Sequence, residues 1–265
     1  MSIRTDLRIA FVGGLTSYRA LFNWLTPWVL VPVFIVQPLF QVLFFAFVGR
    51  SAGLADSRFY LIGDAVQYAS IPCVFAMSNT IADERNSATL PLILVSPARR
   101  LPLFLGRSLP VVLNGFVVSV VALVLGGLLL RVSVPVGSVL PLTLAVAVSA
   151  VSCTGLGLFV AAVALRVREA ATLANIAFGL LLIFCGVNVP LTALPGWMAV
   201  IAHWLPLTHG IAAARTLAAG GSGLGAVGRG LWTELGVGAI YLAIGLALLN
   251  YFEREARRRA TLDVA

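Results

Sequence analysis

The amino-acid sequence predicts an all-α membrane protein with a single transmembrane domain over residues 1–265. The chain is 60% hydrophobic and only 11% charged, and its mean hydropathy is +1.02. A soluble chain of this length does not need so much apolar material to fill one core. Several apolar runs reach the roughly 20 residues that cross a bilayer as a helix. The formal charge of +8 is therefore expected to mark membrane-flanking loops and not a nucleic-acid partner.

The first 23 residues are expected to form an amphipathic helix in the membrane interface. Apolar residues recur there at helical spacing, with arginines beside them: Leu7, Phe11, Leu15, Tyr18 and Phe22. A helix with this pattern can rest in the headgroup layer while its arginines reach water. A frayed tail is the alternative, because Gly13 and Gly14 interrupt the pattern.

Six membrane spans are expected after this segment, at about residues 24–48, 61–81, 108–130, 139–165, 170–189 and 231–251. An even number of spans places both termini on one side. With the termini in the cytoplasm, only five of the 18 basic residues lie outside: Arg50, Arg58, Arg131, Arg215 and Arg229. Because cytoplasmic loops carry the excess of positive charge, this orientation is favoured.

Polar residues inside the spans are candidates for a substrate path, because each is costly in lipid unless it is paired or lines a cavity. Gln37 and Gln41 lie one turn apart around Pro38 in the first span, and Asn175 lies in the fifth. With neighbouring aromatic residues they form the candidate lining: Gln37, Phe40, Gln41, Phe44, Asn175 and Phe178. The alternative is hydrogen bonding between helices that only holds the bundle together.

Small residues recur at an unbroken four-residue step in the fourth span: Ala145, Ser149, Cys153, Gly157 and Ala161. Such a face lets another helix approach closely. It predicts either a subunit interface or ordinary packing within the chain.

Residues 190–215 are expected to form a re-entrant hairpin on the outer side. About ten residues separate Pro195 from Pro206, too few to cross a bilayer. Short helices that dip in and return are allowed where protein or water covers their backbone. Trp197 and Trp204 suit the interface depth of such a hairpin.

The sequence offers no catalytic, metal-binding or cofactor-binding set. His203 and His209 lack a neighbouring carboxylate and an HExxH pattern, Glu234 is expected to be solvated at the outer edge of the last span, and the three cysteines lie singly in apolar runs. A Walker A motif is absent because the chain contains no lysine. The chain is therefore not expected to be an enzyme, and any ATP would be bound by another subunit.

Two stretches carry a resemblance to a known family. The loop after the second span reads DERNSATLPLILVSPARRLPLFLGR, and the outer segment reads PLTALPGWMAVIAHWLPLTHGIAAAR. Their order in a six-span chain resembles the permease subunit of type-2 ABC exporters, a group that includes drug, antibiotic and polysaccharide export permeases. The resemblance covers nearly the whole chain.

The resemblance implies two permeases, identical or related, working with two ATPase subunits that bind ATP and Mg²⁺ in a bacterial cytoplasmic membrane. The loop after span two would be a coupling helix that docks on the ATPase. Its charged and apolar contact residues would be Asp83, Glu84, Arg85, Leu90, Leu92, Ile93 and Leu94. The outer gate would comprise Pro195, Trp197, Trp204, Pro206 and Arg215.

The function expected from this resemblance is export of an amphipathic or lipid-like substrate, such as a drug, antibiotic, lipid or glycan, through a lipid-accessible bundle. Two alternatives stay open. A membrane-embedded lipid-modifying enzyme would act without ATP. A passive pore or scaffold would need no coupling segment.

Overall fold

The computed structural model describes residues 28, 31–53, 56–86, 100–167, 169–220 and 223–259. Every regular element in this part of the chain is a helix, which confirms the all-α prediction. The expected interfacial helix and the apolar part of the expected coupling segment, Leu90 to Leu94, lie outside the described residues. The side chains of Asp83, Glu84 and Arg85 also lie outside them, although their backbone is helical.

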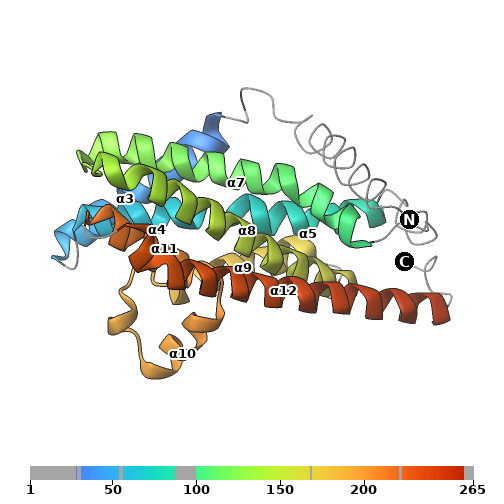
Figure 1. Cartoon of the computed structure of the whole chain (residues 1–265). Coiled ribbons are helices and arrows are strands. Elements are labelled where there is room, and N and C mark those ends of the chain that lie inside the picture. The colour runs from blue at the N-terminus through green and yellow to red at the C-terminus, as the bar shows by residue number, and fades with distance from the viewer. Residues whose placement is uncertain are drawn as a thin grey trace.

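Long helices run side by side and form a bundle (Figure 1). In chain order the elements are η1 (Pro32–Val36), α3 (Gln37–Ser51), α4 (Ser57–Tyr68), α5 (Ser70–Asn86), α7 (Arg100–Leu130), α8 (Val136–Val167), α9 (Ala170–Phe184), η2 (Leu191–Ala193), α10 (Gly196–Trp204), α11 (Thr208–Ala218) and α12 (Leu224–Arg259). Helices α4 and α5 are separated only by a turn at Ala69. The turn between α7 and α8 lies at one end of the bundle, and the C-terminal end of α12 lies at the other (Figure 1).

Five helical segments among the described residues are long and apolar enough to cross a membrane: Pro32–Ser51, Ser57–Asn79, Ser108–Leu130, Val136–Val167 and Leu224–Phe252. The chain is therefore a multi-pass membrane protein. The predicted fifth span differs, because α9 has only 15 residues and ends at Phe184 and not at 189. The helix stops before Gly186, which has a φ of +74° that continues no helix.

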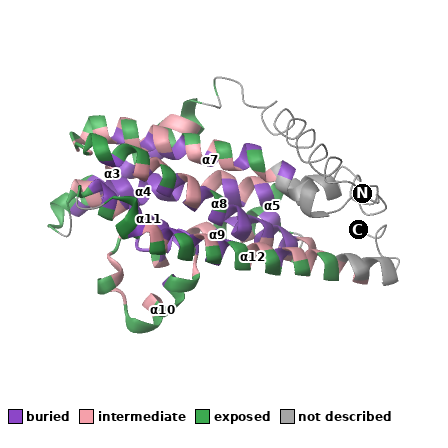
Figure 2. Cartoon of the chain, viewed as in Figure 1, coloured by how far each residue is buried: buried purple, intermediate pink, exposed green. Residues whose placement is uncertain are grey.

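Helix α8 forms the centre of the bundle, and its residues are mostly buried (Figure 2). The predicted stripe of small residues packs inside the chain. A Cβ at Gly157 would meet the backbone of Cys73 on α5, and Ser149 lies against Gly210 on α11. Of the two interpretations of the stripe, packing within the chain is therefore the one this structure displays.

The opposite face of α8 packs closely on α12. An added Cβ at Gly238 would lie 2.6 Å from the Cα of Ser152, and the Ser152 hydroxyl donates to the carbonyl oxygen of Glu234 at 2.9 Å. Further along, a Cβ at Gly245 would lie 2.9 Å from the backbone nitrogen of Phe159. Glycine thus allows two membrane-spanning backbones to approach almost to contact.

The first span contains a wide turn, η1, directly before Pro38. Proline lacks the N–H that an α-helix would direct to the carbonyl of Phe34, and its ring crowds that carbonyl. The N–H of Gln37 instead donates to the carbonyl of Pro32, five residues earlier. The helix thus widens by one residue where an α-helical bond cannot form.

Candidate functional site

The segment between α9 and α12 turns back towards the bundle instead of crossing it. Helix α10 projects from the side of the bundle (Figure 1). Its main contacts within the described residues are with its neighbours α9, η2 and α11. Helix α11 packs on α4, α8 and α12. The chain thus forms two short helices on either side of Pro206, and their re-entry into the membrane stays a prediction.

Arg215 holds the C-terminal half of α11 to two other parts of the bundle. Its guanidinium donates to the carbonyls of Gly186 at 2.6 Å and Val187 at 2.7 Å, and to the carbonyl of Phe59 at 3.1 Å. It also lies over the Phe59 ring, 3.5 Å from the centroid. Burial lowers the pKa of Arg215 to about 10, so the side chain stays charged at neutral pH.

Glu234 holds the other end of α11. Its carboxylate accepts the N–H groups of Leu207 at 2.6 Å and Gly210 at 3.0 Å, at the point where α11 begins. A helix start leaves such donors unpaired and carries a partial positive charge, so a carboxylate there is doubly favourable. The expectation of a solvated Glu234 was wrong, because its side chain is fully buried.

The turn before α11 is fixed by several further contacts. Leu207 has a φ of +83°, a left-handed conformation that is unusual for leucine and is held here by the bond to Glu234. The hydroxyl of Thr208 donates to the carbonyl of Ala202 at 2.6 Å. The thiol of Cys185 lies 3.3 Å from the carbonyl oxygen of Pro206. The hairpin is therefore closed at its base.

A buried polar cluster lies between α3 and α4. The Gln41 amide donates to Oδ1 of Asp64 at 2.9 Å and to Oε1 of Gln67 at 3.2 Å. Asp64 and Gln67 are fully buried. Asn188 lies beside Asp64. Oδ2 of Asp64, Nε2 of Gln67 and both side-chain polar atoms of Asn188 nevertheless make no well-aligned hydrogen bond within the described residues. The cluster therefore contains polar groups that are close together but not aligned for hydrogen bonds.

The predicted substrate-path residues divide between separate places. Gln41 joins the cluster on α4, but the Gln37 side chain is exposed and only its carbonyl is used, by the hydroxyl of Tyr68 at 3.1 Å. Phe40 and Phe44 are exposed on the same helix. Asn175 donates to its own helix at the carbonyl of Ala171.

Phe178 packs on Phe75 of α5, where the ring centroids lie 6.5 Å apart. The residues of α9 therefore do not join those of α3 in one cluster.

The predicted gate residues also differ in environment. Trp197 and Trp204 are exposed, as is Pro195, whereas Pro206 is buried beneath the turn. Trp197 contacts Phe184, with ring centroids 6.1 Å apart. The rings of His203 and His209 stack at 5.6 Å, and no group of three or more metal-binding side chains occurs in the described part of the chain.

Sequence reasoning missed Asp64 and Gln67 and misjudged Glu234. Asp64 and Gln67 lie in an apolar span one helical turn apart, a spacing that could have identified them as a pair on one face. The same one-turn spacing identified Gln37 and Gln41 as a pair on one face of the first span. For Glu234 the sequence carries no signal for its partners, which are backbone groups 24 and 27 residues away.

A comparison with known families bears on this arrangement. The family model described as ABC-2 type transporter matches residues 15–218, which include the polar cluster and α11 up to its last residue. No curated protein matches the chain.

Proposed function

The chain belongs to the ABC-2 type transporter family, and on that premise we propose that it is the permease subunit of an ATP-driven exporter. ATP and Mg²⁺ would bind to a partner ATPase, since this chain has neither a lysine nor a Walker A motif. Two permeases and two ATPases would form the working unit in a bacterial cytoplasmic membrane, with both termini in the cytoplasm.

The observation that carries this proposal is the hairpin anchored at both ends of α11. Arg215 and Glu234 hold α11 to the bundle, while α10 has few contacts outside the hairpin. A firm base with a less constrained tip suits an outer gate that opens and closes over a path. The cargo would be amphipathic or lipid-like, because the exposed faces of the spans are apolar.

Force from the ATPase would enter through residues 83–97, of which the structure describes the backbone of residues 83–86. The backbone of α5 extends to Asn86, beyond the span that ends at Asn79, so the charged residues continue the same helix. A push on α5 would act on α4 and its polar cluster, because only the turn at Ala69 separates the two helices.

The test is co-purification of the chain with the products of its neighbouring genes in mild detergent, followed by an ATP hydrolysis assay. We expect an ATPase at one copy per permease. Replacing Glu84 and Arg85 together with alanine should remove either the partner or its hydrolysis. The matched control replaces Glu169 and Arg229, an exposed acid and an exposed base that lie outside residues 83–97 and outside every site described here.

Purification of the chain alone, without ATPase activity, would contradict the proposal. So would a double variant of Glu84 and Arg85 that behaves like the control. Activity of the chain without ATP would favour the enzyme alternative.

A further inference from the structure

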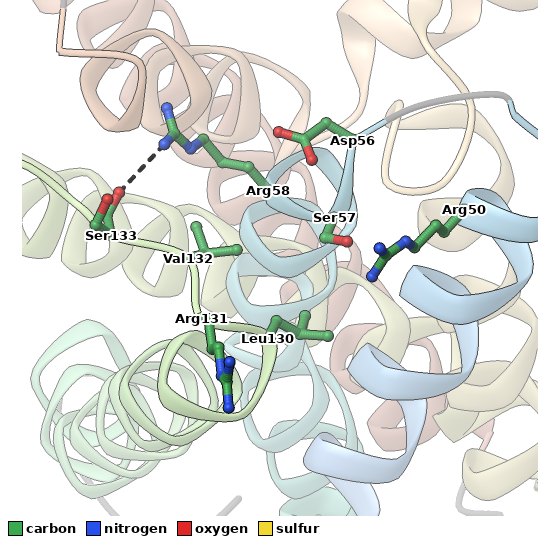
Figure 3. A pocket seen from close by; sticks show the side chains of 8 residues that line it. All are labelled: Arg50, Asp56, Ser57, Arg58, Leu130, Arg131, Val132 and Ser133. Carbon is green, nitrogen blue, oxygen red and sulfur yellow. Dashed lines mark hydrogen bonds between the residues drawn. The ribbon is translucent and has the colours of Figure 1, made fainter.

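A charged pocket of about 380 Å³ lies at the hairpin end of the bundle, outside the polar cluster. It opens between the last turn of α3, the first turn of α4 and the turn from α7 to α8 (Figure 3). Its polar lining consists of Arg50, Asp56, Ser57, Arg58, Arg131 and Ser133, referred to below as the arginine pocket. Three of the five arginines on the predicted outer side thus line one pocket, although their side chains point in different directions (Figure 3).

The charges of the arginine pocket do not cancel. The lining includes three arginines and one aspartate, and no ion pair joins Asp56 to the arginines within the described residues. Arg58 donates to the carbonyl of Ser133 at 3.3 Å. The pocket therefore has a net positive charge.

The backbone of Arg131 adds an independent argument. Arg131 has a φ of +53° at the end of α7, and the N–H of Val132 bonds to the carbonyl of Gly127 at 2.9 Å. This is a Schellman-type helix end, where glycine is the favoured residue. An arginine there costs backbone strain, which a ligand for its side chain would offset.

We propose that the arginine pocket binds a phosphate group at the membrane surface. A guanidinium group binds two phosphate oxygens at once, so the arginines that line the pocket suit this ligand. The pocket lies where four spans end or begin, at Ser51, Ser57, Leu130 and Val136, which is headgroup depth. The phosphate source is a phospholipid headgroup or free phosphate, and the two are separable. The proposal depends on the proposed function in one respect only: the orientation of the chain decides whether this side of the membrane is called the outer side.

The experiment measures binding to the full-length chain, with two variants and one control. Native mass spectrometry would score retained phosphatidylglycerol against diacylglycerol, which lacks the phosphate, and a thermal shift assay would titrate inorganic phosphate. The variants are Arg131→Gly and Arg58→Gln. The control is Arg229→Gln, an exposed arginine on the same predicted side but outside the pocket.

We expect the wild type and the control to retain phosphatidylglycerol at several times the level of diacylglycerol, and both pocket variants to lose this preference. Arg131→Gly should at the same time melt higher than wild type without ligand, because glycine relieves the strained backbone. A phosphate-dependent rise in melting temperature, lost in both variants, would instead identify free phosphate as the source.

Absence of any preference or phosphate shift in the wild type would overturn the proposal. Equal retention by the wild type and Arg131→Gly would also overturn it. Neither result depends on an ATPase partner, so failure here is distinguishable from failure of the proposed exporter.

Discussion

Glu234 and Asp64 are both fully buried carboxylates in spans of the bundle, but their oxygens are used differently. Both oxygens of Glu234 accept backbone N–H groups of the turn before α11. Asp64 uses one oxygen with the rotatable amide of Gln41, and its other oxygen makes no well-aligned hydrogen bond among the described residues. A carboxylate held by backbone is part of the scaffold, whereas one held by a side-chain amide can exchange partners.

The largest loss of stability should follow from Glu234→Ala, which would remove the carboxylate that is held by backbone N–H groups. The N–H groups of Leu207 and Gly210 would be left buried and unpaired, at a cost of about 3 kcal/mol or more in the free energy of unfolding. Thermal unfolding in detergent would measure it. Glu169→Ala, an exposed carboxylate, should change stability by less than about 0.5 kcal/mol. If the two variants had the same melting temperature, Glu234 would not be part of the scaffold.

Arg215→Lys should give the next largest effect, because it tests whether α11 needs both anchors. A single ammonium cannot reach three carbonyls from two segments as the planar guanidinium does, so we expect a loss of about 2–3 kcal/mol. The same change at the exposed Arg229 should be almost neutral. Wild-type stability of Arg215→Lys would mean that positive charge alone holds this end of α11.

Gly238→Ala tests whether the bonds of Glu234 depend on the close approach of α8 and α12. The added methyl would press on Ser152, whose hydroxyl bonds to the Glu234 backbone, at a cost of about 1–3 kcal/mol. Gly236→Ala on the same helix has no atom within 4 Å of its new methyl and should be neutral or slightly stabilising. Similar melting of the two variants would show that the helices can separate without loss.

The smallest expected difference in stability is between two variants in which the same chemical change, carboxylate to amide, is made at each carboxylate. Glu234→Gln keeps one acceptor for two N–H groups and should lose about 1–2 kcal/mol. Asp64→Asn keeps the acceptor used by Gln41 and should change stability by less than about 1 kcal/mol. ATP hydrolysis by the assembled transporter should fall in Asp64→Asn if partner exchange matters. If Asp64→Asn destabilised the protein more than Glu234→Gln, Asp64 and not Glu234 would be the carboxylate on which the scaffold depends.

The all-helical membrane fold could be predicted because the length of an apolar run is a local property of the sequence. The end of α9 could not be predicted. Residues 185–189 are as apolar as the helix before them, and the carbonyls there are used by Arg215, which lies far along the chain. Hydropathy therefore predicts where the chain enters the membrane better than where a helix stops.

The candidate site was predicted in part for a similar reason. Proline spacing predicted the hairpin, and Gln41 was identified from its place in a span. Its true partners, Asp64 and Gln67, follow only from the packing of α3 on α4. The burial of a side chain within a helix depends on which element covers it, and the position of Glu234 in the sequence gives no indication of that.

The wide turn at Pro32–Val36 also changes how the first span presents its faces. An α-helix advances about 100° per residue, so one extra residue offsets the surface before the turn from the surface after it by roughly that angle. Phe40 and Phe44 share a face with each other, but α-helical counting back across the turn would assign Val31 and Pro32 the wrong direction relative to them. A neighbouring helix or lipid that lies along Phe40 and Phe44 therefore meets a different set of residues at Val31 and Pro32 from the set that a continuous α-helix would present.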